Sequence, residues 1–338
     1  MPFNLHSLYS DSIPPFMAEL IATSPMQRLD RVGMNCGCEY TRSPVAMHLH
    51  PYSRLDHSIG AALIVWRFTH SAEQAVAALF HDISTPCFAH TIDFMLGDYR
   101  KQEATEGRTG QVIRSSEEIT SVLAKYGIDV SDVTNYHRYS IADNDGPRLS
   151  SDRLEYTCSN SINYEVRDRA DVAVFFNDIA VTKNEDGEDE LAFIHADQAF
   201  IFASSSLSCS HVYSSDTDRY TMQMLAELVK SALDAGLVTL EELYTLTEDV
   251  IIQRFKSDPV FRKLWMDYCS IKGTYCTALL PDGLSEDRPG EWRKLIVKKR
   301  YIDPLIIDRG RATELFREYR SAVEDYLEST MDYWICRL

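Results

Sequence analysis

The stretch AEQAVAALFHDI, residues 72–83, is apolar on nearly all sides and carries the polar pair His81-Asp82 near its end. This pattern predicts a buried helix with Ser71 as its N-cap. A buried carboxylate without a partner costs several kcal/mol or takes up a proton. Positive charge is therefore expected beside Asp82. A divalent cation meets this need, because imidazole and carboxylate both bind zinc, iron and manganese.

The other ligands of such an ion are expected on other helices, because neighbouring side chains on one helix diverge by roughly 100°. His57 is one candidate, since it opens an apolar helical pattern that runs to Thr69. Asp152 is another, at the start of the amphipathic string Asp152-Arg153-Leu154-Glu155-Tyr156. Taken singly, His57 is more simply a cap or a core histidine, and Asp152 an N-cap. Together the four residues predict one metal site.

The composition is that of a globular protein, with 338 residues, 45% hydrophobic and 25% charged. The formal charge is −17, so the surface is expected to repel duplex nucleic acid. A nucleotide is still compatible, because a bound cation and a few arginines reverse the potential locally. The eight cysteines form no C-x-x-C pair, and there is no signal segment and no apolar run of membrane length. We therefore expect a soluble, cytoplasmic protein that binds no membrane.

The periodicity of apolar residues predicts a mainly α fold, a helical bundle with a small β-hairpin insertion and a C-terminal helical lobe. Two short helices are expected within 15–31 and a loop over 42–52. Longer helices are expected at 57–69, 72–83, 115–126, 151–160, 217–235, 240–256, 258–270 and 311–332. Strand-like text at 172–179 and 190–194 around a turn at 184–187 predicts the hairpin, and 295–307 a further strand or two. The bundle is expected to span 1–235, with the hairpin near 172–195, and the lobe 236–338.

The order of these motifs resembles a known family. Arg54-x-x-His57, then His81-Asp82, then Asp152-Arg153-Leu154-x-Tyr156 is similar to the HD superfamily of metal-dependent phosphohydrolases, nearest the deoxynucleoside triphosphate triphosphohydrolase branch. The strings 27–29, 54–60 and 88–90 resemble the Q-R-L, R-x-E-H-S-x-G and P-F-x-H of that branch. The resemblance covers about residues 20–160.

This resemblance implies an HD-domain helical bundle with a divalent metal ion, and it does not distinguish Mn, Fe, Mg, Zn and Ni. The implied metal ligands are His57, His81, Asp82 and Asp152. The residues implied to line the phosphate and sugar side of the cleft are Arg54, His90, Arg153 and Tyr156. A metal polarises a phosphoryl oxygen and arginine offsets charge on the others, which fits these roles. Related enzymes form multimers, so a homo-oligomer is expected by analogy.

The sequence also departs from the family. Thr85 stands where the family has the second histidine of H-D-x-G-H, and Thr105-Glu106 where it has a His-Glu pair. Threonine is no general acid or base near neutral pH, so other residues must handle protons. His90 is a candidate acid, or simply a buried hydrogen-bonded histidine. Glu103 and Glu106 are candidate bases or ligands, or simply solvated loop acids.

Two further motifs are left open. His137 is a candidate to approach the site ahead of Asp152, with surface packing as the plainer interpretation. The basic string 298–300 either approaches a phosphate at the edge of a cleft or protects an edge strand.

These patterns predict a metal-dependent phosphohydrolase whose substrate is a nucleotide or a similar phosphoester or phosphoanhydride. The nucleophile is expected to be a water activated at the metal or held by Glu106 or His90. The alternative is a nucleotide-binding regulatory HD protein with weak or no catalysis, which the threonines at 85 and 105 favour. A third possibility is a purely structural metal that holds three helices together.

Overall fold

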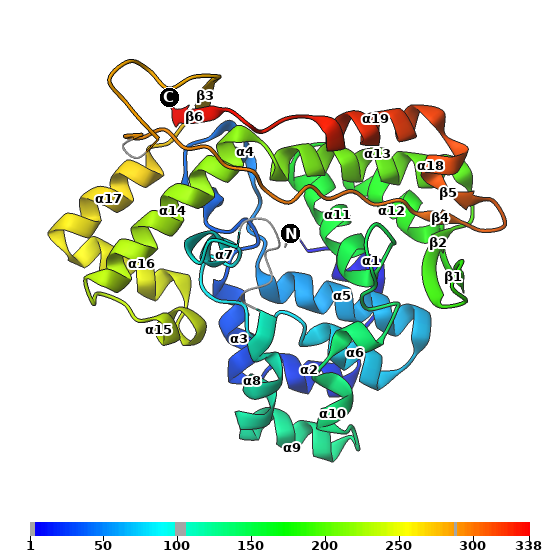
Figure 1. Cartoon of the computed structure of the whole chain (residues 1–338). Coiled ribbons are helices and arrows are strands. Elements are labelled where there is room, and N and C mark those ends of the chain that lie inside the picture. Colours follow the sequence, from blue (N-terminus) through cyan, green and yellow to red (C-terminus); the bar gives the residue numbers. More distant parts are fainter. Residues whose placement is uncertain (1–3, 99–105, 287–288) are drawn as a thin grey trace.

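The computed structural model describes residues 4–98, 106–286 and 289–338, and it is mainly helical (Figure 1). Up to residue 215 the α-helices are α1 (His6–Tyr9), α2 (Pro15–Ile21), α3 (Ser24–Arg28), α4 (Pro44–His48), α5 (Arg54–Thr69), α6 (Ala72–Leu79), α7 (Thr91–Met95), α8 (Thr109–Ser115), α9 (Glu117–Lys125), α10 (Val130–Val133), α11 (Ser151–Asn163), α12 (Arg169–Asn177) and α13 (Ala196–Tyr213). The later α-helices are α14 (Asp216–Asp234), α15 (Leu240–Thr245), α16 (Glu248–Ser257), α17 (Pro259–Cys269), α18 (Ala312–Leu315) and α19 (Arg317–Glu328). The short 3-10 helices are η1 (Leu29–Arg31), η2 (Cys38–Tyr40), η3 (Glu106–Arg108) and η4 (Tyr136–Arg138).

Helix α5 lies at the centre of the larger hydrophobic core. A capping box starts it, because Ser53 accepts from the backbone of Asp56 while Asp56 accepts from the backbone of Ser53. Leu63 and Ile64 are fully buried, and the helix packs against α6 on one side and α11 on another (Figure 1). The first turns of α5 and α11 are thereby brought together.

A second hydrophobic core joins α14, α16 and α17, on the left of Figure 1. Leu225, Phe255 and Trp265 fill it, and Ile335 near the C-terminus reaches it. The segment between 289 and 304 has no regular structure and leads back to the larger core, which includes Ile302. Chain on both sides of residue 235 thus enters each core, and the predicted two-region division stays a prediction.

The strands form two small sheets. Four strands lie in the order β1 (Ile179–Lys183), β2 (Asp189–Phe193), β4 (Leu305–Ile306), β5 (Gly310–Arg311). β2 pairs antiparallel with β1, with Val181 opposite Leu191, and parallel with β4, with Phe193 opposite Ile306. The second sheet pairs β3 (Thr274–Thr277) with β6 (Trp334–Arg337) antiparallel. The four-stranded sheet therefore ties the hairpin to a segment more than 100 residues later.

The prediction of a mainly helical fold with a small β element is confirmed. The predicted strand 172–179 is wrong over 172–178, because these residues belong to α12 and its C-cap Asp178, and only Ile179 lies in a strand, β1. Asp168 caps that helix, and Val172, Phe175 and Phe176 are buried at helical spacing. The hairpin instead uses 179–183, and its predicted turn is in place.

Several element boundaries differ from those predicted. The helix starting at Ala72 ends at Leu79, so His81 and Asp82 lie in the turn that follows. The predicted helix 240–256 is broken at Leu246, whose backbone is extended, and 311–332 breaks at Phe316 in the same way. Residues 44–48 of the predicted loop form α4, and only two residues of 295–307 form a strand. Among the helices described, none is both long and apolar enough to cross a bilayer.

Candidate metal centre

Three side chains from three segments converge beside α5. They are His57 in the first turn of α5, His81 in the turn after α6, and Asp152 in the first turn of α11. Nε2 of His57 lies 3.1 Å from Nε2 of His81 and 3.0 Å from Oδ1 of Asp152, and Nε2 of His81 lies 3.7 Å from that oxygen. Ligands 2.0–2.1 Å from a tetrahedral ion lie about 3.4 Å apart. The three atoms are therefore spaced to share one ion.

Hydrogen bonds behind each imidazole fix which nitrogen faces this centre. Nδ1 of His57 donates to Oε2 of Glu155 at 2.6 Å, and Nδ1 of His81 donates to the carbonyl oxygen of Ala78 at 2.7 Å. Carboxylate and carbonyl oxygens only accept, so each Nδ1 carries a proton and each neutral ring has its lone pair on Nε2. A metal-ligating histidine needs this tautomer, with an acceptor of this kind behind it.

Two lone pairs and a carboxylate oxygen repel one another unless a positive charge lies among them. In the metal-free protein a proton provides that charge. Burial lowers the pKa of His57, but its hydrogen bonds to Asp152 and Glu155 raise the pKa to about 10. Burial raises the pKa of Asp152, but the hydrogen bond and charge of His57 lower it to about 2. A divalent cation provides the same charge, so the residues fit a metal.

Glu155 supports His57 from within the core. Its side chain is 1% exposed, its Oε2 also accepts from the hydroxyl of Tyr52, and its Oε1 accepts from Ser159 at 2.8 Å. Gly60 makes room for this carboxylate, because a Cβ at residue 60 would lie 2.6 Å from Cγ of Glu155. The glycine of the 54–60 motif thus permits the close approach of α11 to α5.

Asp82, the fourth predicted ligand, lies at the edge of the cluster. Its Oδ2 is 3.5 Å from Nε2 of His81 and accepts from Nη1 of Arg54 at 2.9 Å. Burial raises the pKa of Asp82, but the charges of Arg54 and the two histidines hold it well below its usual range. Thr85 donates to Oδ1 of Asp82 at 2.8 Å, so its hydroxyl orients this carboxylate.

His90, a predicted catalytic residue, forms a pair with Asp93. Nδ1 of His90 donates to Oδ2 of Asp93 at 2.8 Å, and Asp93 is fully buried whereas His90 is 32% exposed. Burial lowers the pKa of His90, Asp93 raises it, and the charge of Arg54 lowers it further, so the net shift is downward. Phe88 and Ala89, just before it, have positive φ angles of 64° and 44°. Such strained backbone persists where the surroundings enforce it, often at functional sites.

Glu248, the first residue of α16, holds this strained segment from the other side. Its Oε1 accepts from the backbone N–H of Phe88 at 2.9 Å and of Gly33 at 3.2 Å. The nearby Glu39 has a pKa of about 8, raised by burial and by the charge of Glu248. Both acids line a cavity of about 450 Å³.

Arg153 and Tyr156, both predicted to bind substrate, face different surroundings. Arg153 donates to Oδ1 of Asn144 at 2.7 Å and to its carbonyl oxygen at 2.6 Å, so its guanidinium holds the loop before α11. Tyr156 lies one helical turn after Asp152 on α11, where burial raises its pKa to about 12 and the charge of Asp152 raises it as well. Arg300 opposes that shift, which places its charge near Tyr156.

The residues of the basic string 298–300 have different surroundings. Arg300 also lowers the pKa of His90, so its positive charge acts on the same side of the centre. Lys299 instead donates to backbone carbonyls at the C-terminal end of α19. The edge-strand interpretation is wrong for these residues, which are not in a strand.

Most of the remaining predicted site residues lie in or next to 99–105, a segment outside the described residues. Glu106 opens η3, but its side chain lies outside the described residues, as do Glu103 and Thr105. His137 follows Tyr136, whose ring packs 5.5 Å from the ring of His81. Nδ1 of His137 lies 2.7 Å from Oδ2 of Asp143.

Sequence reasoning missed two carboxylates that matter here, Glu155 and Asp93. Each lies three residues after a predicted site residue, Asp152 and His90 respectively. Side chains three apart share a helix face, so this spacing was a usable signal.

Comparison with known proteins bears on the fold and on the reaction class. No family model matches the chain. It is 24% identical over 254 residues to the uncharacterised protein YdhJ of Bacillus subtilis, covering 73% of this chain and 74% of that one. It is 26% identical over 150 residues to the metal-dependent phosphohydrolase cns2 of Cordyceps militaris, covering 44% and 41% respectively.

A solved structure shares the fold. The crystal structure of a phosphohydrolase from Bacteroides thetaiotaomicron matches with a TM-score of 0.65 and 16% identity, covering 96% of each chain. The chain is therefore similar in sequence to one metal-dependent phosphohydrolase and has the fold of another phosphohydrolase.

Proposed function

We propose that this protein is a metal-dependent phosphohydrolase of the HD type, acting on a nucleotide or a similar phosphoester or phosphoanhydride. The observation that carries the proposal is the convergence of His57, His81 and Asp152, with an acceptor behind each Nδ1 so that both Nε2 atoms face the centre. Asp82 is proposed as the fourth ligand, since it lies 3.5 Å from Nε2 of His81. The named phosphohydrolases among the similar proteins support the reaction class.

The surrounding residues have the chemistry that such a reaction needs. A divalent cation held by these residues would polarise a phosphoryl oxygen toward attack by water. Arg54 and Arg300 place positive charge beside it, which favours the remaining phosphate oxygens. His90 has a lowered pKa, so near pH 7 its ring is neutral and able to accept a proton from water. Asp93 orients that ring and stabilises its protonated form.

The finer proposal is a nucleoside triphosphate as substrate, close to the deoxynucleoside triphosphate triphosphohydrolases. It is supported by the order of the motifs around Arg54, His81 and Asp152. A triphosphate also carries enough charge to require a cation together with Arg54 and Arg300.

A nucleotide-binding regulatory protein with weak or no catalysis is the second candidate. Thr85 favours it, because its hydroxyl is bound to Asp82 and supplies no proton near neutral pH.

The test is a phosphate-release screen on chelator-stripped protein. The protein is reloaded separately with Mn, Fe, Mg, Zn or Ni and given ribo- and deoxynucleoside mono-, di- and triphosphates, and phosphate, pyrophosphate and tripolyphosphate are measured. We expect release only with metal and loss of release in His81→Ala. The matched control is His195→Ala, whose imidazole is also bound to a carboxylate, Asp178, but is 69% exposed.

The two candidates give different results. Thermal stabilisation by a nucleotide without any release would favour the regulatory protein over the enzyme. A His81→Ala variant that keeps its metal and full turnover would contradict the metal centre itself.

A further inference from the structure

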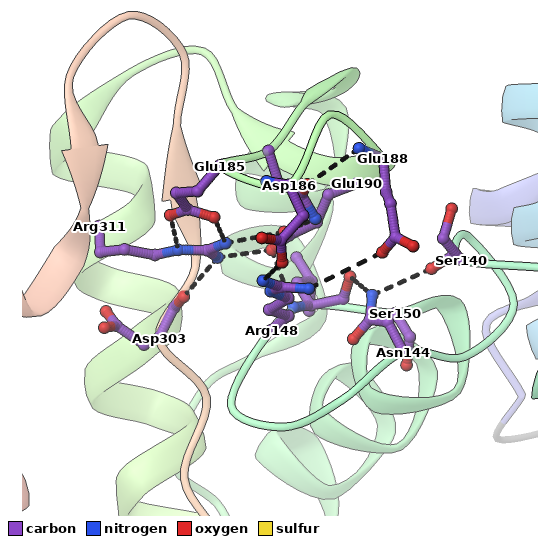
Figure 2. A network of polar contacts seen from close by, with 12 residues as sticks. Ser140, Asn144, Arg148, Ser150, Glu185, Asp186, Glu188, Glu190, Asp303 and Arg311 are labelled. Carbon is purple, nitrogen blue, oxygen red and sulfur yellow. Dashed lines mark hydrogen bonds and ion pairs between the residues drawn. The ribbon is translucent and has the colours of Figure 1, made fainter.

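A second polar cluster, in which Glu190 is fully buried, lies around Arg311 of β5 (Figure 2). Its guanidinium grips Glu190 of β2 with two hydrogen bonds of 2.6 and 2.8 Å, and Glu185 with two of 2.7 and 2.6 Å. A fifth N–H bond reaches the carbonyl oxygen of Asp303 at 3.1 Å. All five N–H donors of Arg311 thus meet acceptors.

Glu190 connects Arg311 to the loop before α11. It is fully buried, and its Oε1 also accepts from the backbone N–H of Leu149 at 3.3 Å. The carbonyl oxygen of Leu149 in turn accepts from Asn144 at 2.9 Å, and Figure 2 shows Asn144 bonded to Ser140 as well. A buried carboxylate keeps such a position only while its counter-charge is present.

The same loop sets the start of α11, where Asp152 lies. Arg153 binds Asn144 through both its side-chain and its backbone oxygen, at 2.7 and 2.6 Å. Ser150 caps the helix by accepting from the backbone of Arg153, and the backbone of Ser151 is bonded to Ile141 at 2.8 Å. A continuous chain of hydrogen bonds therefore runs from Arg311 through Glu190, Leu149 and Asn144 to Arg153, the residue next to Asp152.

We propose that Arg311 is a positioning residue for the metal centre: by neutralising Glu190 it fixes the loop at 144–150 and so places Asp152 against His57. The inference rests on the proposed function only in taking Asp152 as a metal ligand. The strand pair β4–β5 then contributes to metal affinity from outside the centre, as outer-shell partners of metal ligands do.

The test measures Mn²⁺ binding to chelator-stripped protein by titration calorimetry. Arg311→Gln is expected to weaken the affinity by about tenfold. The matched control is Arg293→Gln. Arg293 makes a similar two-pronged bond to Glu227, at 2.6 and 2.6 Å, far along the chain from the ligands. Arg293→Gln is expected to lower the melting temperature while leaving Mn²⁺ affinity unchanged.

A rescue separates positioning from a merely structural role. Arg311→Gln combined with Glu190→Gln removes the buried charge, while the new amide oxygen still accepts from Leu149. Most of the lost Mn²⁺ affinity is expected to return in this double variant. Arg311→Lys keeps the positive charge but loses the two-pronged guanidinium, and it is expected to weaken Mn²⁺ binding by about threefold. If Arg311→Gln does not fold, Arg311→Lys takes its place in the test. Unchanged affinity in either folded single variant would overturn the proposal, as would equal loss in Arg293→Gln.

A second readout does not depend on metal. Hydrogen exchange of the amides at 140–153 is expected to accelerate in Arg311→Gln but not in Arg293→Gln. If the parent protein binds neither Mn²⁺ nor any of Fe, Mg, Zn and Ni, the proposed function fails, while exchange still decides whether Arg311 fixes this loop. Unchanged exchange at 140–153 would then refute the positioning role.

Discussion

Around Arg311 each of five N–H donors meets an acceptor, whereas around His57 three acceptor atoms face one another within 4.8 Å. Each cluster is built around one buried side chain, Glu190 in the first and His57 in the second, and both combine carboxylates with nitrogen groups. The first is complete within the chain, as buried polar groups normally are. The second becomes complete only with an added positive charge. Completeness of pairing therefore distinguishes a cluster that supports the fold from one arranged to hold a ligand.

The largest effect should come from removing charge at the incomplete cluster. Asp152→Asn keeps the shape of the side chain but removes its charge, so we expect metal content to vanish and turnover to fall by about 1,000-fold. Elemental analysis and phosphate release measure the two losses. Asp332→Asn, at a 65% exposed carboxylate paired with Lys294, is the control and should change neither. Retained metal in Asp152→Asn would break the comparison.

The complete cluster should respond in stability. Glu190→Ala leaves Arg311 without a buried partner, and we expect the free energy of unfolding to fall by about 3 kcal/mol in urea denaturation. Glu227→Ala removes an equally well-bonded but 37% exposed carboxylate and should cost less than about 1 kcal/mol. Equal losses of unfolding free energy in the two variants would show that the burial of Glu190 does not determine its contribution to stability.

Removing the support behind His57 should weaken the centre without abolishing it. Glu155→Gln keeps the size but replaces a charged acceptor by a neutral one, so metal affinity should fall by about tenfold. Calorimetric titration of stripped protein measures this. Ser159→Ala, which loses a hydrogen bond to the same carboxylate but does not touch His57, should have a smaller effect. A larger loss of metal affinity in Ser159→Ala than in Glu155→Gln would contradict the proposed support of His57 by Glu155.

The smallest effect concerns the buried acid pair of Glu39 and Glu248. The pKa of Glu39 is raised to about 8, so the folded state binds its proton more tightly than the unfolded state. The stability from this group is present below its ordinary pKa, near 4.5, and is lost as the pH rises through 8. Glu39→Gln should therefore melt a few degrees higher than the parent at pH 8.5 and equally at pH 4.5.

The control for this pair is Glu188→Gln, at a 57% exposed carboxylate. Its melting temperature should follow that of the parent at both pH values. A Glu39→Gln variant with the pH profile of the parent would show that folding does not raise the pKa of Glu39.

The sequence was sufficient where local pattern decides structure. The apolar periodicity of 57–69 and 151–160 placed two ligand-bearing helices correctly, because each helix buries one continuous stripe. The three residues that converge, His57, His81 and Asp152, were all predicted from their position at the ends of buried segments.

Long-range partners explain most of what was missed. Strand β4 has two residues and pairs with β2 more than 100 residues earlier, and β3 pairs with β6 near the C-terminus. No local pattern encodes such pairings. The string at 172–177 was predicted to be a strand because valine and phenylalanine are common in strands. The same residues suit a buried helix face equally well, and here they form one.

Gly60 has a practical consequence for engineering. A glycine in the middle of a helix destabilises it by about 0.5–1 kcal/mol relative to alanine, so it is an obvious target for thermostabilisation. Here an alanine methyl group would collide with Glu155 and push it away from His57. Helix α5 is therefore less stable than it would be with alanine at residue 60, because Glu155 must stay close to His57. Thermostabilising substitutions should begin at other glycines.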